Sequence, residues 1–397
     1  MSWPIVKLVQ ICSRIDYGLT ASAIVTNYGP RFLRITDIQD NTVDWSSVPS
    51  CQCSLKELED NRLENGDIVF ARTGATTGKS FLIKELNIDS VFASYLIRIR
   101  PNYKVNPLYL SYFFKSSKYW HQITKMANGV AQPGINSTKL KELEIPLPPL
   151  KEQYRIASIL DRADKICQKR KQAITLADDF LRATFFEMFG DPVKNPKRWK
   201  TDKIKKGMLA ITSGWSAIGE NTPCKSDEFG VLKISSVTSG VFKPEENKVV
   251  ACESIPASKK LIRPKKGDLL FSRANTRELV AAICMVHQDY DNLFLPDKLW
   301  SIKLNHELLL PEFFLILIQN EKVRELLTKQ ATGTSGSMLN ISKNKFEETE
   351  IIYPEINVQK DFCNAFRKTI NLKEKLIKSN ELADESFNSL SQKVFLQ

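Results

Sequence analysis

The segment Gly66-Asp67-Ile68-Val69-Phe70-Ala71-Arg72 occurs again, in related form, as Gly267-Asp268-Leu269-Leu270-Phe271-Ser272-Arg273, at an offset of 201 residues. In both copies a Gly-Asp pair precedes an apolar run, which is a strand signal. Further matches follow in the same order along the chain: Leu33-Arg34-Ile35-Thr36 with Leu232-Lys233-Ile234-Ser235, Glu144-Ile145 with Glu350-Ile351, Pro148 with Pro354, Gln153 with Gln359, and Leu176-Ala177-Asp178 with Leu382-Ala383-Asp384. Collinear matches of this kind predict an internal duplication.

Each half of the chain has the same plan. A segment rich in β-branched residues, glycine and turns comes first, a proline-containing linker follows, and a long helical segment ends the half. Proline cannot continue a helix or donate within a central strand, so the linkers Ile145-Pro146-Leu147-Pro148-Pro149 and Ile352-Tyr353-Pro354 mark boundaries. Strand signals lie at 94–100 and 267–271, and helix signals lie at 108–120 and 312–327. Each half is therefore predicted to be an α+β domain with a small, twisted sheet.

The long helical segments repeat apolar residues at alternating spacings of three and four, with charged residues between them. The first segment contributes Ile156, Ile159, Ala163, Ile166, Ala173, Ala177 and Phe180, and the second Phe362, Ala365, Thr369, Leu372, Leu376, Ala383 and Leu390. This pattern favours helices packed as a coiled coil, although Arg170 and Ser379 interrupt it. A duplicated chain would pack the two helices antiparallel, and about 35 residues make a rod of roughly 50 Å. The alternative is that each helix caps its own domain.

The sequence therefore predicts an α+β fold with two tandem, duplicated domains, residues 1–149 and 190–355. Two long helices, residues 150–189 and 356–397, would join these domains as an antiparallel coiled coil with a pseudo-two-fold axis. The length of 397 residues agrees with this organisation, because single domains usually hold about 100–200 residues.

The charge balance favours an anionic partner. Lys and Arg number 57 against 45 Asp and Glu, a formal net charge of +12, and nucleic acid is the commonest partner for such a surplus. The 8 cysteines include no CxxC pair, which predicts reduced thiols in a cytoplasmic protein and no metal site. The start, Met1-Ser2-Trp3-Pro4, lacks the pattern of a signal peptide, and the apolar runs are too short to span a membrane. We therefore expect no membrane partner.

No motif predicts a catalytic site in this chain. Gly74-Ala75-Thr76-Thr77-Gly78-Lys79-Ser80 resembles a phosphate-binding loop, but three residues separate its glycines where four are needed, and Thr73 stands where the first glycine should be. His121, His287 and His306 have no neighbouring cysteine or carboxylate pattern that would form a triad or a metal site. We therefore expect no enzyme activity, metal or cofactor in the chain itself.

Two pairs of polar loops are candidates for contact with DNA. The first pair follows the repeated strand, where arginine can read guanine or grip phosphate and asparagine can read adenine. The alternative is a solvated turn whose arginine pairs with a carboxylate such as Asp67. The second pair comprises residues 128–136 and 332–340, and its alternative is a helix start capped by Asn136 or Ser342. The candidate DNA-binding residues are Arg34, Thr36, Arg72, Thr73, Lys79, Gln132, Asn136, Lys233, Ser235, Arg273, Asn275, Thr276, Arg277, Ser335 and Ser337.

Several motifs, in their order, resemble those of the specificity subunits of type I restriction–modification enzymes. They are Gly66-Asp67 with Phe70 and Arg72, the segment 145–153, Ile156-Ala157 with Leu160-Asp161, the segment 188–197, and Gly267-Asp268 with Phe271 and Arg273. The resemblance covers the whole chain. The second linker departs from the family pattern, because Pro354-Glu355-Ile356-Asn357 replaces Pro-Pro-Leu.

The resemblance implies that the two domains are target-recognition domains, each reading one half of a bipartite double-stranded DNA target. It also implies that the long helices act as a spacer and dock two methyltransferase subunits and, through them, restriction subunits. S-adenosylmethionine, ATP and magnesium would then belong to the partner subunits, and this chain would not be an enzyme by itself. The candidate docking and spacer residues are Ile156, Ile159, Ala163, Ile166, Phe362, Ala365, Leu372 and Leu376.

Three other functions remain open from the sequence. A solitary specificity subunit could lend its domains to another system by recombination. A coiled-coil protein–protein scaffold would make the helices the functional surface and the basic charge incidental. An enzyme with its own nucleotide site would depend on the loop at 74–80, whose spacing does not fit.

Overall fold

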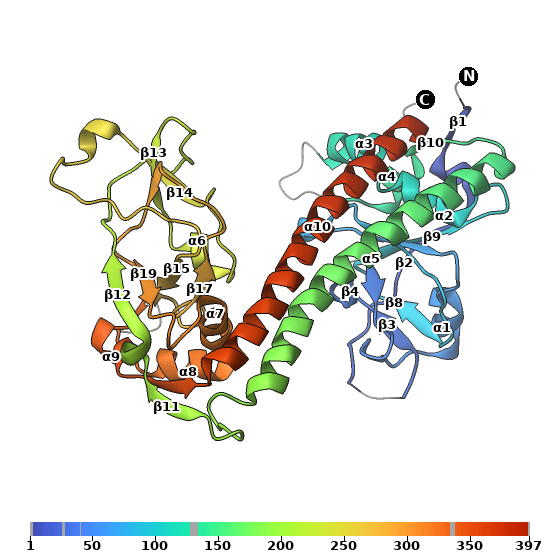
Figure 1. The fold of residues 1–397 in the computed structure, drawn as a ribbon. Helices are drawn as coiled ribbons and strands as arrows, with labels where there is room; N and C mark the ends of the chain where they lie inside the picture. Colours follow the sequence, from blue (N-terminus) through green and yellow to red (C-terminus); the bar gives the residue numbers. More distant parts are fainter. Residues whose placement is uncertain (1–2, 26–27, 40, 128–133, 334–337, 396–397) are drawn as a thin grey trace. The chain divides into compact units, whose positions relative to one another are not determined.

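The computed structural model describes residues 3–25, 28–39, 41–127, 134–333 and 338–395, and its fold is mixed α+β (Figure 1). The chain divides into two compact units. Unit 1 contains Met1–Gln172 and Ile377–Gln397, and unit 2 contains Ala173–Leu376. Both boundaries fall inside long helices, so each unit contains part of both helices. Within the described residues, no helix is long and apolar enough to cross a membrane.

The main sheet of unit 1 has four antiparallel strands in the order β2-β9-β6-β7. They are β2 (Cys12–Tyr17), β9 (Leu96–Pro101), β6 (Ile68–Ala71) and β7 (Ser80–Leu82). The smaller pairs are β1 (Ile5–Lys7) with β10 (Glu144–Pro146), β3 (Arg31–Leu33) with β8 (Ser90–Phe92), and β4 (Ile38–Gln39) with β5 (Thr42–Val43). The shorter helices are α1 (Leu55–Asn61), α2 (Pro107–Phe113), α3 (Ser117–Ala127) and α4 (Ser137–Lys141). β9 confirms the strand predicted at 94–100, although the strand begins two residues later and ends one residue later than predicted.

The main sheet of unit 2 has the same kind of order, β12-β19-β15-β17, and is also antiparallel. Its strands are β12 (Met208–Ser213), β19 (Leu299–Leu304), β15 (Leu269–Ser272) and β17 (Ile283–Met285). The smaller sheets contain β14 (Asn247–Val250), β13 (Phe229–Leu232) and β18 (Leu293–Phe294); β16 (Ala274–Asn275) and β20 (Leu339–Asn340); and β11 (Lys200–Lys203) and β21 (Glu350–Tyr353). The shorter helices are α6 (Ser235–Thr238), α7 (Pro311–Gln319), α8 (Glu321–Lys329) and α9 (Lys343–Glu347). β15 confirms the strand predicted at 267–271.

The repeated Gly-Asp pair forms the same turn in both units. Gly66 and Gly267 have φ angles of 99° and 87°, in the left-handed region that favours glycine. Oδ2 of Asp67 and of Asp268 each accepts a hydrogen bond from the backbone N–H three residues earlier, at 2.8 and 3.0 Å. The aspartate therefore closes the turn that starts β6 or β15, and its role in the motif is structural.

The helix signals at 108–120 and 312–327 are confirmed, but each segment forms two helices with a break between them. α2 and α3 occupy the first segment, and α7 and α8 occupy the second. At the break in unit 2, Asn320 has an extended ψ of 128° and its side chain accepts a hydrogen bond from the Lys322 N–H. At the break in unit 1, the Ser116 hydroxyl accepts one from the Tyr119 N–H. A capping side chain starts a new helix even where the apolar pattern runs on.

The two long helices are α5 (Leu150–Phe189) and α10 (Ile356–Phe395), which lie side by side within each unit (Figure 1). In unit 1, Arg170 Nη1 donates to the Ser379 carbonyl at 2.7 Å. In unit 2, Lys373 Nζ lies 2.6 Å from Asp178 Oδ1, and the rings of residues 185 and 362 are 5.6 Å apart. In unit 2 the residue numbers therefore rise along α5 as they fall along α10, so the helices are antiparallel there.

The apolar stripe predicted for α5 was wrong at three positions. Ile159, Ile166 and Phe180 are 38%, 50% and 55% exposed, and Leu372 on α10 is 55% exposed. The buried positions of α5 between its ends include Ile156, Leu160, Cys167, Ala177 and Leu181. α5 carries two adjacent apolar stripes, and periodicity alone does not tell which of two such stripes packs inward.

A buried glutamine holds the start of each long helix. The Gln153 side chain accepts a hydrogen bond from the Asn106 N–H (2.8 Å) and donates to the carbonyls of Lys104 (3.2 Å) and Pro148 (2.8 Å). The Gln359 side chain makes the same three kinds of bond, with Leu310 (2.9 Å), Leu308 (2.9 Å) and Pro354 (2.8 Å). Both side chains are thus fully satisfied away from water, which fixes where the helix leaves its domain.

Candidate nucleic-acid interface

Arg72 directly follows β6, an inner strand of the main sheet of unit 1. Its guanidinium stacks on the ring of Tyr17, with Cζ 4.9 Å from the ring centre. Nη1 makes one long hydrogen bond to the Ser94 carbonyl, at 3.4 Å, and Nε is buried without a partner in the described part of the chain. The aromatic ring positions the guanidinium, and its terminal nitrogens keep donors that can contact a base or a phosphate.

Tyr17 is itself fixed by the helix that follows the second polar loop. Its hydroxyl accepts a hydrogen bond from the Ser137 N–H at 3.0 Å. Burial acts to raise the pKa of Tyr17, but the Ser137 hydrogen bond and the Arg72 charge hold that pKa below its ordinary value. The contact therefore joins the two candidate loops of unit 1.

The loop that resembles a phosphate-binding loop folds as a tight turn. The Thr77 N–H donates to the Gly74 carbonyl and the Lys79 N–H to the Thr76 carbonyl, so these amides are used inside the turn. Thr73 forms a β-bridge with Gly134. The Lys79 side chain is exposed and has no ion pair among the described residues.

Arg273, the counterpart of Arg72, has a different environment. Its Nε donates to the Asp297 carbonyl at 2.9 Å, its Nη1 donates to Asn340 Oδ1 at 2.9 Å, and its Nη2 lies 3.4 Å from Asp297 Oδ2. The guanidinium thus links three segments of unit 2. For this arginine the geometry agrees with the turn alternative, although the carboxylate is Asp297 and not the residue corresponding to Asp67.

The remaining candidates of this loop in unit 2 are two residues bonded within the protein, Asn275 and Thr276, and one exposed cation, Arg277. Asn275 lies in β16, and its Oδ1 accepts a hydrogen bond from the Thr276 N–H at 2.8 Å. The Thr276 carbonyl accepts from two later backbone N–H groups. Arg277 is exposed, without an ion pair in the described part of unit 2. Arg277 is therefore the cation of this loop that remains available to a ligand.

The candidates before β6 and β15 are mostly engaged within the protein. Arg34 pairs with Asp37 through two contacts, at 2.7 and 3.1 Å, and the hydrogen bond to this carboxylate raises the pKa of Arg34. Ser235 Oγ donates to Glu246 Oε2 at 2.7 Å. Thr36 is exposed and Lys233 half-buried. The four residues thus lie at the ends of strands β3 and β13, with Thr36 as the most accessible.

The second pair of polar loops is described only in part. Gln132, Ser335 and Ser337 lie outside the described residues. Asn136 Oδ1 accepts from the Lys139 N–H at 2.8 Å and so caps α4. Ser342 caps α9 in the same way, through the Lys345 N–H at 3.3 Å. The helix-cap alternative therefore holds for the described end of each loop.

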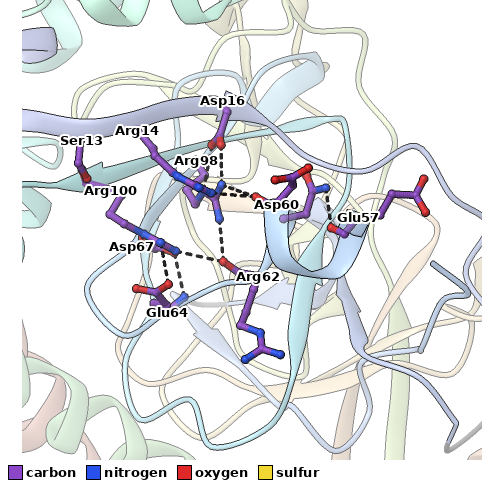
Figure 2. Close-up of polar contacts among 11 residues, drawn as sticks. Ser13, Arg14, Asp16, Glu57, Asp60, Arg62, Glu64, Asp67, Arg98 and Arg100 are labelled. Carbon is purple, nitrogen blue, oxygen red and sulfur yellow. Dashed lines mark hydrogen bonds and ion pairs between the residues drawn. The ribbon is translucent and has the colours of Figure 1, made fainter. Parts of the chain in front are cut away.

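An internal cluster of arginines and acids in unit 1 was not predicted from the sequence (Figure 2). Arg98, on β9, has no exposed surface. Its Nε donates to Asp16 Oδ1 at 2.9 Å, and its terminal nitrogens donate to the carbonyls of Arg62 (2.7 Å) and Asp60 (2.9 Å). Two residues along the strand, Arg100 pairs with Asp67 at 2.7 Å. The alternation of Arg98, Ile99 and Arg100 was read only as a strand, because partners so distant in sequence leave no local signal.

Among the described residues, no group of three or more His, Cys, Asp or Glu side chains could hold a metal ion. The cysteines are free, and burial raises the pKa of the Cys12 and Cys363 thiols to about 12. The groups that the structure brings together in the loops are therefore cations, amides and hydroxyls.

Comparison with known proteins agrees with the resemblance. Residues 24–176 match the family described as type I restriction modification DNA specificity domain. The chain is 23% identical over 376 residues to the type I restriction enzyme EcoKI specificity subunit of Escherichia coli K12, covering 91% of this chain and 80% of that protein. It is 28% identical over 261 residues to the putative type I restriction enzyme MjaX specificity subunit of Methanocaldococcus jannaschii, covering 64% of this chain and 58% of that one.

The fold is also similar to solved structures. The S subunit of a type I restriction–modification system from M. genitalium aligns with a TM-score of 0.58 at 14% identity, over 99% of this chain and 96% of that one. A chain from another type I system aligns with a TM-score of 0.54 at 17% identity. The chain is thus similar over most of its length to type I restriction enzyme specificity subunits, and residues 24–176 match the DNA specificity domain of that family.

Proposed function

We propose that the chain gives a type I restriction–modification complex its DNA sequence specificity. Residues 1–149 and 190–355 are two duplicated target-recognition domains, each of which reads one half of a bipartite double-stranded DNA target. The long helices form an antiparallel coiled coil with a pseudo-two-fold axis, which spaces the domains and docks methyltransferase and restriction subunits. The chain is not catalytic by itself, and S-adenosylmethionine, ATP and magnesium are used by the partners.

The observation that carries this proposal is a common frame with different side chains at its edge. β6 and β15 occupy the same place in sheets of equivalent order, and both begin with the same Gly-Asp turn. At their ends, Arg72 stacks on Tyr17 with free donors, whereas Arg273 is held internally and Arg277 is exposed. Two domains with one frame and different cations at one edge suit two half-sites of different sequence. The net charge of +12 suits the phosphate backbone.

Exposed apolar side chains on the long helices support partner docking. In unit 1, Ile159 and Ile166 lie seven residues apart, on one face of α5, and are 38% and 50% exposed. In unit 2, Leu176 and Phe180 lie four residues apart on α5 and are 64% and 55% exposed. Exposed apolar side chains that lie together on one helix face form the kind of patch that marks a partner interface. Ile159 and Ile166 were predicted both on the seam and as docking and spacer residues, and their exposure supports the docking role.

The decisive experiment is coexpression with the methyltransferase subunit of a type I system from the same host, followed by mapping of methylated adenines in the genome. We expect one bipartite motif with a fixed gap. Substitution of Arg72 by Ala should relax or abolish recognition of one half-site and leave the other half unchanged. A stable complex with no new methylation would contradict the proposal and favour the scaffold function, since assembly would then not require DNA reading.

The spacer role has a separate test. Insertion of one heptad in α5 alone lengthens that helix by about 10 Å, at 1.5 Å per residue. We expect loss of methylation at the original motif while both units remain folded, as measured by hydrogen exchange. Retained methylation at the original gap would contradict the spacer role and leave DNA reading by the domains untouched.

A further inference from the structure

Unit 2 contains a pocket of about 680 Å³ beside its main sheet. Thr212 and Ser301, which lie opposite each other on β12 and β19, form part of its lining. The segment that precedes β15, residues 255–265, forms much of the remainder, with Lys303 and Asp268. Small-molecule sites in proteins usually have volumes of about 300–1,000 Å³, so the pocket has the size of a ligand site.

The corresponding place in unit 1 is filled by Arg98. Ala71 lies opposite Leu96 and Ser272 opposite Leu299, so Arg98 and Ser301 are both two residues further along equivalent strands. Across the sheet, Asp16 lies opposite Arg98, as Thr212 lies opposite Ser301. The Arg98 side chain reaches the carbonyls of the segment before β6, residues 60 and 62 (Figure 2). In unit 2 a serine and a threonine take the places of the arginine and the aspartate, and a pocket takes the place of the ion pair.

Two hydroxyl side chains line the pocket, those of Thr212 and Ser301. Ser301 is 2% exposed, whereas Thr212 is exposed. Thr212 Oγ1 lies 3.5 Å from the Ser301 carbonyl, which accepts its hydrogen bond. A serine hydroxyl can donate to an anion, so a ligand in the pocket would meet a donor at Ser301.

The lining is strongly cationic. Lys259, Lys260 and Arg263 are exposed at the pocket and form no ion pair within the described residues, whereas Lys265 is paired with Asp291 at 2.5 Å. The fifth cation, Lys303, lies close enough to Asp268 for its charge to act to lower the pKa of that carboxyl group. Asp268 itself accepts the hydrogen bond that closes the turn before β15. The unpaired positive charge therefore exceeds the single negative charge, which favours a multiply charged anion.

We propose that this pocket binds a phosphate group, with Arg263 and the neighbouring lysines on its charge and the Ser301 hydroxyl as a donor. Arginine and lysine beside hydroxyl groups are the usual protein partners of phosphate oxygens. The wall also contains Phe229, Ile255 and Leu261, which offer an apolar surface to the sugar or base attached to the phosphate. The phosphate can belong to a free nucleotide or to the backbone of bound DNA, and only the second source rests on the proposed function.

The first experiment titrates the full chain, in complex with its methyltransferase subunit, with inorganic phosphate and with AMP by calorimetry. We compare the wild type with Arg263→Ala, Ser301→Ala and Lys225→Ala. Lys225→Ala is the control, because Lys225 is an exposed lysine of unit 2 that does not line the pocket. If a free nucleotide is the ligand, AMP binds the wild type and the control with equal affinity. It binds the two pocket variants at least fivefold more weakly.

The second experiment measures the affinity of the same complexes for a non-specific duplex at several salt concentrations. If DNA is the source of the phosphate, Arg263→Ala lowers the slope of log affinity against log salt by about 1, as loss of one phosphate contact does. Lys225→Ala leaves the slope unchanged. Methylation mapping of the wild type, as above, tests the proposed function independently of either result.

A filling variant tests the pocket itself. Thr212→Asp with Ser301→Arg rebuilds in unit 2 the pair that fills this place in unit 1, so it should abolish AMP binding or the change in slope. If this variant does not fold, Ser301→Ala and Arg263→Ala still decide. The proposal is overturned if phosphate, AMP and the DNA slope are all insensitive to Arg263→Ala, or if the folded filling variant binds like the wild type.

Discussion

β9 of unit 1 and β19 of unit 2 have the same place in their sheets but very different surroundings. Arg98 on β9 is buried against Asp16 and two carbonyls, whereas Ser301 on β19 faces a pocket lined by unpaired lysines. The turn before the neighbouring strand, with its left-handed glycine and closing aspartate, is the same in both. The difference teaches that the turn and the strand register can stay the same while the side chains at equivalent positions change. In one unit they form an ion pair, and in the other they leave a pocket.

The largest expected effect follows from removing Arg98. Arg98→Ala leaves the Asp16 carboxylate and two carbonyls without their partner, so we expect a loss of about 3–5 kcal/mol in the stability of unit 1. Hydrogen exchange with mass spectrometry should report faster exchange in residues 12–17 and 96–101. Ser301→Ala, at the equivalent place in unit 2, should cost less than about 1 kcal/mol. Equal effects of the two substitutions would show that the two strands do not differ in the way described.

A double substitution sharpens this prediction. Asp16→Leu with Arg98→Met removes both charges and keeps apolar volume, so it should recover most of the stability lost in Arg98→Ala. Denaturation by urea measures the recovery. No recovery would mean that the carbonyls of residues 60 and 62, rather than the Asp16 charge, account for the loss.

Gln153 and Gln359 should behave alike, because they make the same set of hydrogen bonds in the two units. Substitution of either by Ala leaves buried backbone groups unsatisfied and should cost about 1–3 kcal/mol in its own unit. Gln122→Ala is the matched control, since Gln122 also bonds the backbone but in an exposed position. A large loss for one glutamine and none for the other would break the equivalence of the two helix starts.

Arg72 and Arg273 should behave differently. Arg273→Ala removes contacts to Asp297 and Asn340, so we expect a loss of about 1–2 kcal/mol in the stability of unit 2. Arg72→Ala removes one long hydrogen bond and the stacking on Tyr17 and should change stability by less than about 1 kcal/mol, while it alters the half-site recognised. Urea denaturation and methylation mapping on the same two variants measure both effects. A stability loss larger for Arg72→Ala than for Arg273→Ala would reverse the assignment.

The smallest effect concerns the entry into unit 2. Hydrogen bonds from the Lys322 side chain and the Lys194 N–H lower the pKa of Asp191 to about 2. A carboxylate with a lowered pKa stabilises the fold above its unfolded pKa, and this contribution is lost as pH falls from about 4 to about 2. The stability of unit 2 should therefore fall less over this range in Asp191→Asn than in the wild type. Parallel pH profiles of the two proteins would contradict the assignment.

Parts of the site could be predicted and parts could not. The strands that end at Arg72 and Arg273 were found from the repeat, and the caps at Asn136 and Ser342 were anticipated as alternatives. The stacking of Arg72 on Tyr17 and the pairing of Arg273 with Asp297 were not. Those partners come from other strands and loops, and neither pattern nor spacing encodes which distant group reaches a given guanidinium.

The sequence by itself determined the mixed α+β class, the Gly-Asp turns and the existence of two long amphipathic helices, because turn chemistry and periodicity are local properties. Only the tertiary structure decided which stripe of α5 is buried, where α2 ends and α3 begins, and that Arg98 fills in unit 1 the place that Ser301 leaves open in unit 2. These outcomes depend on packing between segments far apart in the chain, where several arrangements of the same local pattern compete and the best-packed one wins.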